Sequence, residues 1–336
     1  LELLERLHQS LGLPRFELDQ RMFAEDDLEA ARTARRLLDA ELPADGLLEV
    51  ARVIGRAIET VAAASRELVG SALLKAGDTE LDVARRYASA AAELGPLMGS
   101  LLDYQYRTRL REGLRREAAV PPEALEAGEL PGAVEVAVGF ADLVDFTRLG
   151  EQLPAEDVGR VAGRLAEMAD EVAEEPVRLV KTIGDAAMLV STETAPLVDA
   201  LLALVERSQA EGEDIPQLHA GAARGIALGR AGDWYGRPVN LASRVAEMAR
   251  PGSVLVEAGV RDAIRAELGL ADEGQGSGEE ARDEGDEGSE GGTEGHREGG
   301  DAGEPYRWSR AGRRRIKGVE DRVSLYRVRP AGNGAG

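Results

Sequence analysis

The sequence of 336 residues contains no cysteine and only three histidines, His8, His219 and His296. The absence of cysteine excludes disulfides, thiolate metal sites and cysteine nucleophiles. The three histidines are too scattered in the sequence to favour a histidine-rich metal site. No run approaches 18 uninterrupted apolar residues, so we expect no transmembrane segment. The N-terminus also lacks a basic region followed by an apolar core, which a cleaved secretion signal requires. We therefore expect a cytoplasmic protein.

The net charge of −21 is concentrated in one tract. Residues 271–304 contain 13 acidic residues and two arginines, a net charge of about −11. The tract has almost no apolar side chain and cannot offset the entropy of ordering itself, which predicts a disordered acidic insertion. The rest of the chain is only mildly acidic. Because Arg313, Arg314 and Arg315 form no more than a local basic cluster, we expect no nucleic-acid partner.

The first 118 residues show apolar side chains at helical spacing. One stripe includes Leu47, Val50 and Ile54, and we expect a further helix from about residue 78 and a separate one over 96–117. Three prolines and two glycines then mark a linker over 119–132. The pattern predicts an all-helical domain over 1–118, which is either a bundle without chemistry of its own or a regulatory domain.

Residues 133–330 alternate between strand-like and helical patterns. A buried strand is expected over 134–140, a helix from Pro154, and a hairpin over 177–190. The order strand–helix–strand–strand–helix–strand, with additions at the C-terminal end, indicates an α+β, ferredoxin-like sheet with its helices on one face. The chain therefore divides into an all-α domain followed by an α+β domain.

Two acidic residues of the second domain follow apolar strands. Asp142 ends the first strand, where an unpaired buried carboxylate would cost several kcal/mol. Asp185 stands at the bend of the hairpin, four residues after Lys181. Two carboxylates at neighbouring strand ends can hold Mg²⁺ with water and substrate phosphates. The alternative for the first segment is a helix or turn cap, supplied by Asp145 or Thr147.

Two further segments place cations beside turns. Asn240 and Arg244 are four residues apart on a helix that Pro238 opens, so both project from one face. An amide beside a guanidinium suits phosphate oxygens and developing negative charge. Lys317 lies in a glycine turn near the C-terminus. These residue types indicate a site for a phosphorylated substrate.

Four segments, FADLVDFT, VKTIGDAAM, GDWYGRPVNLASR and IKGV, occur here in the order found in class III nucleotidyl cyclase catalytic domains. The second domain, apart from the acidic tract, resembles that family over residues 133–330. The resemblance implies that Asp142 and Asp185 bind two Mg²⁺ or Mn²⁺ ions, with the carbonyl of Leu143 as an additional ligand. Asp145 departs from the family pattern, which commonly has glycine in that turn.

The resemblance also assigns the substrate contacts. It implies that Lys181 and Asp233 select adenine, that Asn240 and Arg244 position the ribose and stabilise the transition state, and that Lys317 contacts the terminal phosphates. The reaction implied is conversion of ATP to 3′,5′-cyclic AMP and pyrophosphate, with no side-chain nucleophile.

In this family each active site combines residues of two catalytic domains. Since this chain has one such domain with both sets of residues, the resemblance implies a homodimer with two sites. Lys181 and Asp185 would then serve different sites. The alternative is a catalytically weak, nucleotide-binding scaffold that keeps the cyclase fold and dimerises.

The helical domain also resembles a known one. The segments LLEVARVIGRAIETVAAA and LLDYQYRTRLREGLRRE are similar to the regulatory domain of actinobacterial cyclases described as pH-responsive and autoinhibitory. The resemblance implies a domain that holds the catalytic pair apart until a signal arrives. His8 is the only histidine in this domain, so a proton, a small molecule and a lipid remain alternative signals.

Overall fold

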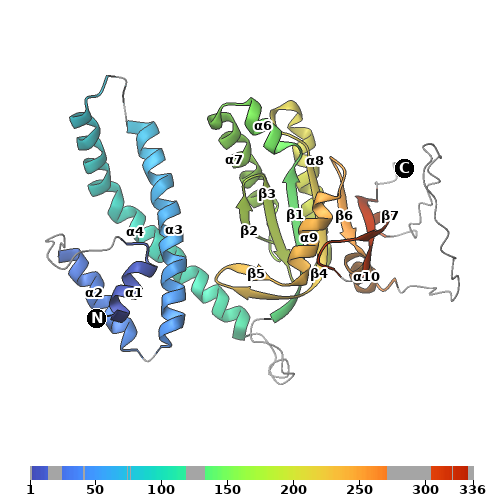
Figure 1. The fold of residues 1–336 in the computed structure, drawn as a ribbon, viewed down its shortest axis with the longest axis horizontal. Helices are drawn as coiled ribbons and strands as arrows, with labels where there is room; N and C mark the ends of the chain where they lie inside the picture. The colour runs from blue at the N-terminus through green and yellow to red at the C-terminus, as the bar shows by residue number, and fades with distance from the viewer. Residues whose placement is uncertain are drawn as a thin grey trace. The chain divides into compact units, whose positions relative to one another are not determined.

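The chain folds into two compact units, Leu1–Glu129 and Leu130–Gly336 (Figure 1). The expected linker, 119–132, and nearly all of the acidic tract, 271–303, lie outside the described residues, so both remain predictions. The computed structural model describes residues 2–13, 25–40, 42–73, 75, 77–118, 133–270, 304–319 and 321–331.

The described part of the first unit is helical. One expectation is wrong: no break occurs at Pro96, because a single helix of 39 residues runs through it. Proline removes only its own N–H, and the turns on either side are rich in alanine and leucine, which favour helix. The helices are α1 (Glu2–Ser10), α2 (Glu25–Leu38), α3 (Ala44–Leu73) and α4 (Glu80–Ala118).

The first unit buries few large apolar side chains. Its core cluster consists of Leu7, Leu48 and Ala51, which join α1 to α3. Many apolar residues of α3 and α4 are exposed, including Leu68 at 64% and Leu97 at 67%. A single copy of this unit therefore leaves extended apolar stripes on two long helices uncovered.

The second unit contains an eight-stranded sheet in the order β2-β3-β1-β4-β6-β8-β7, with β5 paired to β4. β1 runs antiparallel to both β3 and β4, whereas β4 and β6 are parallel. Helix α6 and strand β5 are short elements that the sequence patterns did not predict. The elements are β1 (Ala133–Leu143), α6 (Phe146–Gln152), α7 (Ala155–Val172), β2 (Arg178–Ile183), β3 (Ala186–Ser191), α8 (Thr194–Ala210), a 3₁₀ turn (Gly212–Asp214), β4 (Leu218–Arg230), β5 (Asp233–Tyr235), α9 (Arg237–Glu247), β6 (Val254–Glu257), α10 (Ala258–Glu267), β7 (Tyr306–Arg315) and β8 (Arg322–Pro330).

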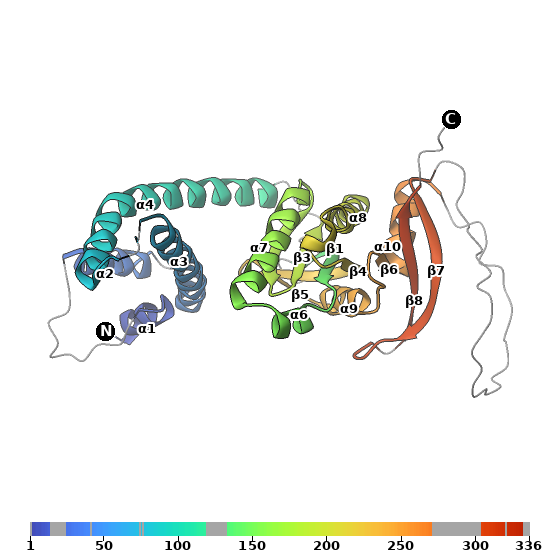
Figure 2. The ribbon, with the colours of Figure 1, turned by 90° about the horizontal axis from the view of Figure 1, so that it is seen from above.

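Helices cover both faces of this sheet, so the expectation of helices on one face is wrong. A Cβ atom on Gly139 would lie 2.9 Å from the Leu201 side chain of α8, whereas one on Gly221 would lie 2.1 Å from the backbone nitrogen of Ala246 in α9. Figure 2 shows α8 and α9 on opposite sides of the central strands. The six successive residues 136–141 of β1 are buried without alternation, as expected for a strand covered on both faces.

Candidate active site

The structure brings the two predicted metal-binding aspartates together. In the β1–β3 register Asp142 lies opposite Ala186, the residue that follows Asp185. The backbone N–H of Leu143 donates a hydrogen bond of 3.0 Å to the carbonyl oxygen of Asp185. The end of β1 is thereby joined to the bend of the β2–β3 hairpin. Asp142, Leu143 and Asp185 therefore form one compact group in a single subunit.

The pKa of Asp142 is raised to about 6: burial is the largest cause, His219 acts in the opposite direction, and the negative charges of Asp185 and Glu247 add to the rise. Burial destabilises an ionised carboxylate because solvent is withdrawn, and a second carboxylate adds repulsion. A divalent cation would remove both penalties, since it supplies compensating charge and accepts carboxylate oxygens as ligands. The pair therefore fits Mg²⁺ or Mn²⁺.

In the described part of the chain, no group of three or more His, Cys, Asp or Glu residues is placed to hold a metal ion. The two aspartates would thus need other oxygens, from the Leu143 carbonyl, from water or from substrate phosphates. Mg²⁺ commonly binds in this manner, through one or two carboxylates with water and phosphate. The capping alternative has little support at Asp145, because its side chain makes no capping hydrogen bond to α6.

Asp145 instead adopts a left-handed backbone conformation in the turn that follows β1. Its φ angle is +57°, in the left-handed region. Aspartate tolerates this conformation better than most residues, while glycine adopts it without steric cost. The substitution of the family's common glycine by Asp145 is therefore compatible with the turn.

The structure also forms the predicted base-selecting pair. The Lys181 ammonium on β2 makes an ion pair with the Asp233 carboxylate on β5, although the two residues are 52 positions apart. Asp233 further accepts a hydrogen bond of 2.9 Å from the backbone N–H of Trp234. Burial tends to raise the pKa of Asp233, but the hydrogen bonds from Lys181 and Trp234 outweigh it and hold that pKa below its usual value. Both side chains are about one-third exposed, so a ligand can reach the pair.

Helix α9 presents Asn240 and Arg244 on its exposed side, opposite the buried Leu241 and Val245. A glycine is required just before this helix: Gly236 has φ +150°, and a Cβ atom there would lie 2.9 Å from the Ile226 carbonyl oxygen. This close approach fixes the start of α9 against β4. The two side chains are thereby held on a surface that a ligand or a second subunit can reach.

The Arg244 guanidinium has one carboxylate partner on its own helix. Its Nη1 donates to both oxygens of Glu247, at 2.8 and 2.9 Å. His219 lies opposite Asp142 in the β1–β4 register and donates from Nδ1 to the Ala246 carbonyl at 2.6 Å. Sequence reasoning missed both Glu247 and His219 as neighbours of Asp142. Only the strand register and the placement of α9 on the sheet reveal them.

Lys317 is exposed in the turn between β7 and β8. The turn is closed by a hydrogen bond of 3.0 Å from the Val319 N–H to the Ile316 carbonyl, and Gly318 has φ +86°. Ile316 and Val319 pack into the same apolar cluster as Leu241 of α9. The hairpin tip is therefore anchored on the sheet face that α9 covers, and its lysine is left accessible.

One subunit thus forms two close pairs, Asp142 with Asp185 and Lys181 with Asp233. No hydrogen bond or ion pair found among the described residues joins one pair to the other. A cavity of about 380 Å³ opens beyond the end of β1, but none of the predicted site residues lines it. Its lining residues are Val144, Asp145, Arg148, Leu149, Gln152, Pro216, Gln217 and Pro251.

Comparison with known proteins identifies the family. The adenylate cyclase regulatory domain matches residues 1–114. The pH-sensitive adenylate cyclase MT1302 of Mycobacterium tuberculosis is 39% identical over 330 residues, which are 98% of this chain and 75% of that protein. The chain belongs to the adenylate cyclase family. Its helical unit is accordingly the regulatory domain, and its sheet unit is the cyclase domain, of an adenylate cyclase enzyme.

Three further matches have lower sequence identity to this cyclase. The adenylate cyclase of Streptomyces coelicolor is 30% identical over 262 residues, 76% of this chain and 66% of that protein. Among solved structures, the adenylyl cyclase CyaB from P. aeruginosa has a TM-score of 0.40 at 18% identity, covering 61% of this chain and 98% of that one. The catalytic core of a rhodopsin-guanylyl cyclase with converted specificity, in complex with ATPalphaS, has a TM-score of 0.43 at 20% identity, covering 59% and 98%.

None of the helices in the described part of this cyclase combines the length and the apolar content that a membrane crossing needs.

Proposed function

We propose that this cyclase converts ATP to 3′,5′-cyclic AMP and pyrophosphate at sites shared between two copies of the chain. One observation carries the proposal: a single chain forms two pairs of side chains suited to different parts of the substrate, and no hydrogen bond or ion pair among the described residues joins one pair to the other. The carboxylate pair Asp142–Asp185 suits metal ions, and the ion pair Lys181–Asp233 suits a base. A partner subunit would bring the missing group to each.

The chemistry of the Lys181–Asp233 pair favours adenine. An ammonium only donates hydrogen bonds, and an ionised carboxylate only accepts them. Adenine presents an acceptor at N1 and a donor at its 6-amino group, so Lys181 can donate to N1 while Asp233 accepts from the amine. Guanine presents a donor at N1 and an acceptor at O6, which reverses both requirements. The pair therefore supports ATP rather than GTP as substrate.

In the reaction, the ribose 3′-oxygen attacks the α-phosphorus in line, the 3′-hydroxyl proton leaves to solvent, and the bond to pyrophosphate breaks. Asn240 would orient the ribose, and Arg244 would donate to the α-phosphate oxygens as charge develops on them. Lys317 would neutralise the departing pyrophosphate. Mg²⁺ or Mn²⁺ held by Asp142 and Asp185 would supply Lewis-acid activation of the attacking oxygen and charge compensation for the triphosphate.

The helical unit would regulate this activity. Its family match is to a cyclase regulatory domain, and the relative from M. tuberculosis is named for its pH sensitivity. A proton is therefore the first signal to test. A small molecule and a lipid stay as alternatives, since His8 is the only histidine of the unit.

A complementation experiment tests the shared site. Asp142→Asn and Arg244→Ala chains should each be inactive alone. Co-expressed in equal amounts, they should regain about a quarter of the unmodified activity, because half of the dimers are mixed and each mixed dimer rebuilds one of its two sites. The measurement is cyclic AMP formed from ATP with Mg²⁺ or Mn²⁺.

The matched control is a mixture of Asp142→Asn with Asp185→Asn chains. Both changes affect the same carboxylate pair, so every mixed dimer has two damaged sites and should stay inactive. A mixture of Asp142→Asn and Arg244→Ala that stays inactive while still forming dimers would contradict a shared site. An unmodified chain that binds ATP without forming cyclic AMP would favour the scaffold alternative.

A further inference from the structure

The last turn of helix α9 is fixed to the sheet at one residue, Ala246. From β4, the Nδ1 of His219 donates a hydrogen bond of 2.6 Å to the Ala246 carbonyl oxygen. Two residues further along β4, a Cβ atom on Gly221 would lie 2.1 Å from the Ala246 backbone nitrogen. Both positions face the same side of the sheet, because alternate residues of a strand do so. The backbone of α9 therefore has little freedom at this turn.

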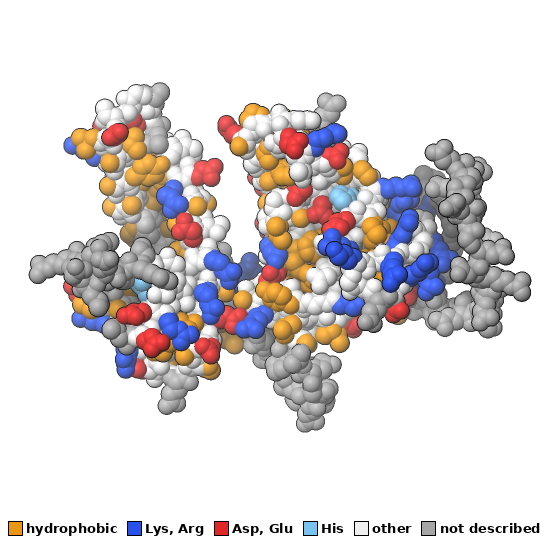
Figure 3. Space-filling view, in the orientation of Figure 1, with side chains coloured by type: hydrophobic (Ala, Val, Ile, Leu, Met, Phe, Trp, Pro, Cys, Tyr) orange, Lys and Arg blue, Asp and Glu red, His pale blue; other side chains and the backbone are white. Residues whose placement is uncertain are grey.

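The same turn carries Arg244, two residues before Ala246, and Glu247, one residue after it. The Nη1 of Arg244 donates to both carboxylate oxygens of Glu247, at 2.8 and 2.9 Å. Both side chains are about half exposed. Figure 3 shows histidine, acidic and basic side chains next to one another on the face of the cyclase domain where Figure 1 labels α9. The arginine thus has its guanidinium held by a carboxylate and its backbone held by the strand beneath.

The contact with Glu247 leaves one edge of the Arg244 guanidinium free. A guanidinium has five N–H donors, and the edge formed by Nε and Nη2 can bind two oxygens at once. No acceptor in the described part of the chain bonds that edge. Glu247 therefore restrains the plane of the guanidinium through Nη1 and does not block the edge that suits a phosphate.

The Arg244–Glu247 ion pair should contribute little to the stability of the fold. Solvent screens an exposed pair of this kind, and both side chains lose rotamer freedom when they form it. Orientation of a catalytic group has much larger consequences, since a small displacement from the reacting atoms lowers the rate by a large factor. An effect of Glu247 on the reaction can therefore be separated from an effect on folding.

We propose that His219 and Glu247 are positioning residues for Arg244: His219 holds the backbone of its turn, and Glu247 holds its guanidinium. The inference rests on the proposed function, in which Arg244 donates to the α-phosphate oxygens of ATP as charge develops on them. In this role neither positioning residue touches the substrate. Both contacts reduce the conformational freedom that Arg244 must lose in the transition state. Their removal should therefore lower kcat and leave the KM for ATP unchanged.

Glu247→Gln tests the contact with the guanidinium. The amide keeps the shape of the side chain, but it removes the negative charge and replaces one acceptor oxygen with a donor group. We expect kcat for cyclic AMP formation to fall about tenfold, because Arg244 is no longer held in one orientation. The KM for ATP should stay within about twofold of its value in the unmodified chain.

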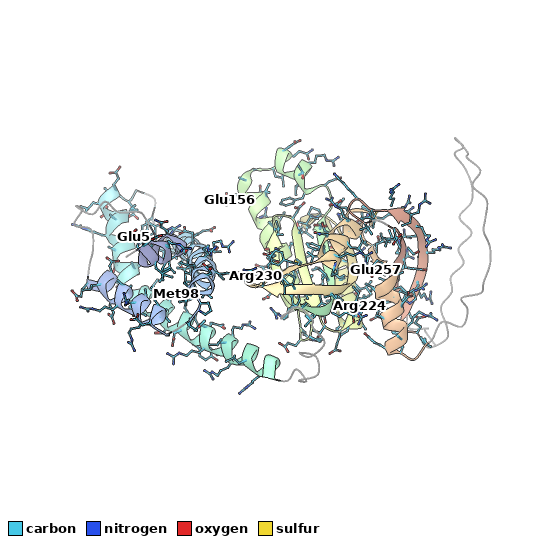
Figure 4. The ribbon with its side chains drawn as sticks, turned by 60° about the horizontal axis from the view of Figure 1, so that its bottom comes forward. Glu5, Met98, Glu156, Arg224, Arg230 and Glu257 are labelled. Atoms are coloured by element: carbon cyan, nitrogen blue, oxygen red, sulfur yellow. The ribbon has the colours of Figure 1, made fainter. Side chains whose placement is uncertain are left out.

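The matched control is Asp157→Asn on α7. Asp157 and Arg160 are also three residues apart on a helix and form an exposed ion pair of 2.6 Å. Figure 4 labels Glu156, the residue before Asp157 at the start of α7. Helix α7 packs into the apolar cluster on the other face of the sheet from α9. The control removes the same type of pair, and kcat and KM should both stay unchanged.

His219→Leu and His219→Asn form a matched pair for the backbone contact. The two new side chains have nearly the same shape, but only asparagine keeps an N–H donor in the position of the histidine Nδ1. Because His219 lies opposite Asp142, it matters that both variants remove the imidazole equally. His219→Leu should lower kcat about tenfold, whereas His219→Asn should keep most of it. Equal losses in the two variants would overturn the positioning role of His219.

Replacing an α-phosphate oxygen of ATP with sulfur gives a readout that a purely structural role would not change. Sulfur accepts hydrogen bonds weakly, so an arginine held on the α-phosphate makes the thio-substituted nucleotide the slower substrate. The ratio of kcat for ATP to kcat for the slower α-thio diastereomer should be about threefold smaller in Glu247→Gln than in the unmodified chain. Asp157→Asn should keep the unmodified ratio. A reduced kcat with an unchanged ratio in Glu247→Gln would overturn the inference.

Equilibrium binding of ATP and urea unfolding, followed by tryptophan fluorescence, complete the comparison. Both should be the same in Glu247→Gln and in the unmodified chain. A loss of ATP binding as large as the loss of kcat would overturn the inference, because the contact would then act before the transition state. An active unmodified chain whose kcat survives Glu247→Gln would overturn this inference alone. An unmodified chain that forms no cyclic AMP would overturn the proposed function, and this inference with it.

Discussion

The two units of this adenylate cyclase differ in how far a single copy buries its apolar side chains. In the cyclase domain, Leu201 and Leu204 of α8 have no exposed surface, and α9 is packed so closely on β4 that only glycine fits at 221. In the regulatory unit, Leu68 and Leu97 on two long helices are about two-thirds exposed. The cyclase domain thus has the core of an independent fold. The regulatory unit leaves large apolar side chains exposed in a single copy.

This difference has a physical basis in the sequence patterns. A sheet covered on both faces buries consecutive residues of its strands, and its helices need only one apolar stripe each. Two long helices joined by a short connection bury only part of each other's surface. Helices α3 and α4 also carry apolar residues outside that buried part, and these side chains are exposed. Substitutions should therefore have unequal effects in the two units.

The largest effect is expected for Gly221→Val. A Cβ atom at this position would lie 2.1 Å from the Ala246 backbone nitrogen, so β4 or α9 must move. We expect a loss of more than about 4 kcal/mol in the free energy of unfolding of the cyclase domain, at the upper end of single-residue effects. Trp234 and Trp308, the only tryptophans, both lie in this domain, so urea unfolding followed by tryptophan fluorescence reports it alone.

A matched control is Gly163→Ala on α7, where no atom lies within 4 Å of the added Cβ. It should stabilise the domain by about 0.5–1 kcal/mol, since alanine favours helix over glycine. If Gly221→Val unfolded at the same urea concentration as the unmodified chain, the tight packing of α9 on β4 would be wrong.

The second prediction compares one substitution in both units. Leu201→Ala should cost about 2–5 kcal/mol, because the side chain is fully buried and leaves a cavity. Leu97→Ala should change stability by less than about 0.5 kcal/mol, because the side chain is 67% exposed in one copy. Hydrogen exchange resolved by peptide measures α8 and α4 separately. A large loss of protection in α4 after Leu97→Ala would show that this stripe is covered in the assembled protein.

A smaller loss than that of Leu201→Ala is expected for Tyr306→Phe. The hydroxyl of the buried Tyr306 donates a part-buried hydrogen bond of 2.8 Å to Asp199, and its loss should cost about 1 kcal/mol at neutral pH. Burial, followed by the interaction with Asp199, raises the pKa of Tyr306 well above its usual value. The folded state therefore favours the protonated phenol. Its contribution should be present below about pH 10, the ordinary tyrosine pKa, and should be lost as the pH rises further.

Urea titrations at pH 8 and pH 11 test the direction of this change in stability with pH. The unmodified chain should lose more stability between the two values than the Tyr306→Phe chain. The same alkaline loss in both chains would mean that Tyr306 does not contribute to it.

Most elements of the cyclase domain, apart from the short α6 and β5, were predictable because their signals are local. The hairpin that carries Lys181 and Asp185 shows two apolar runs around a glycine turn, and β2 and β3 occur there. The helix that Pro238 opens begins one residue earlier, at Arg237. Apolar periodicity, turn residues and helix-opening prolines act over a few positions, so a single sequence displays them.

The predictions that failed depended on competing local preferences or on contacts between distant segments. Pro96 was expected to begin a separate helix, but the helix-forming turns around it outweighed one missing donor, and a single helix runs through it. The covering of both sheet faces depends on α9 crossing β4 beside Gly221, and no local pattern reports that approach. The carboxylate Glu247 and the imidazole of His219 were overlooked as neighbours of Asp142 for the same reason.

The sequence by itself determined which chemical groups this cyclase possesses: two aspartates beside strand ends, a lysine and an aspartate with complementary hydrogen bonding, and no cysteine. Tertiary structure decided which of them meet. The strand register places Asp142 beside Asp185 and Arg315 opposite Arg322. The position of β5 in the sheet brings Asp233 into contact with Lys181. Chain order specifies the groups and local backbone preferences, whereas pairing of distant strands sets the distances on which burial, charge and catalysis depend.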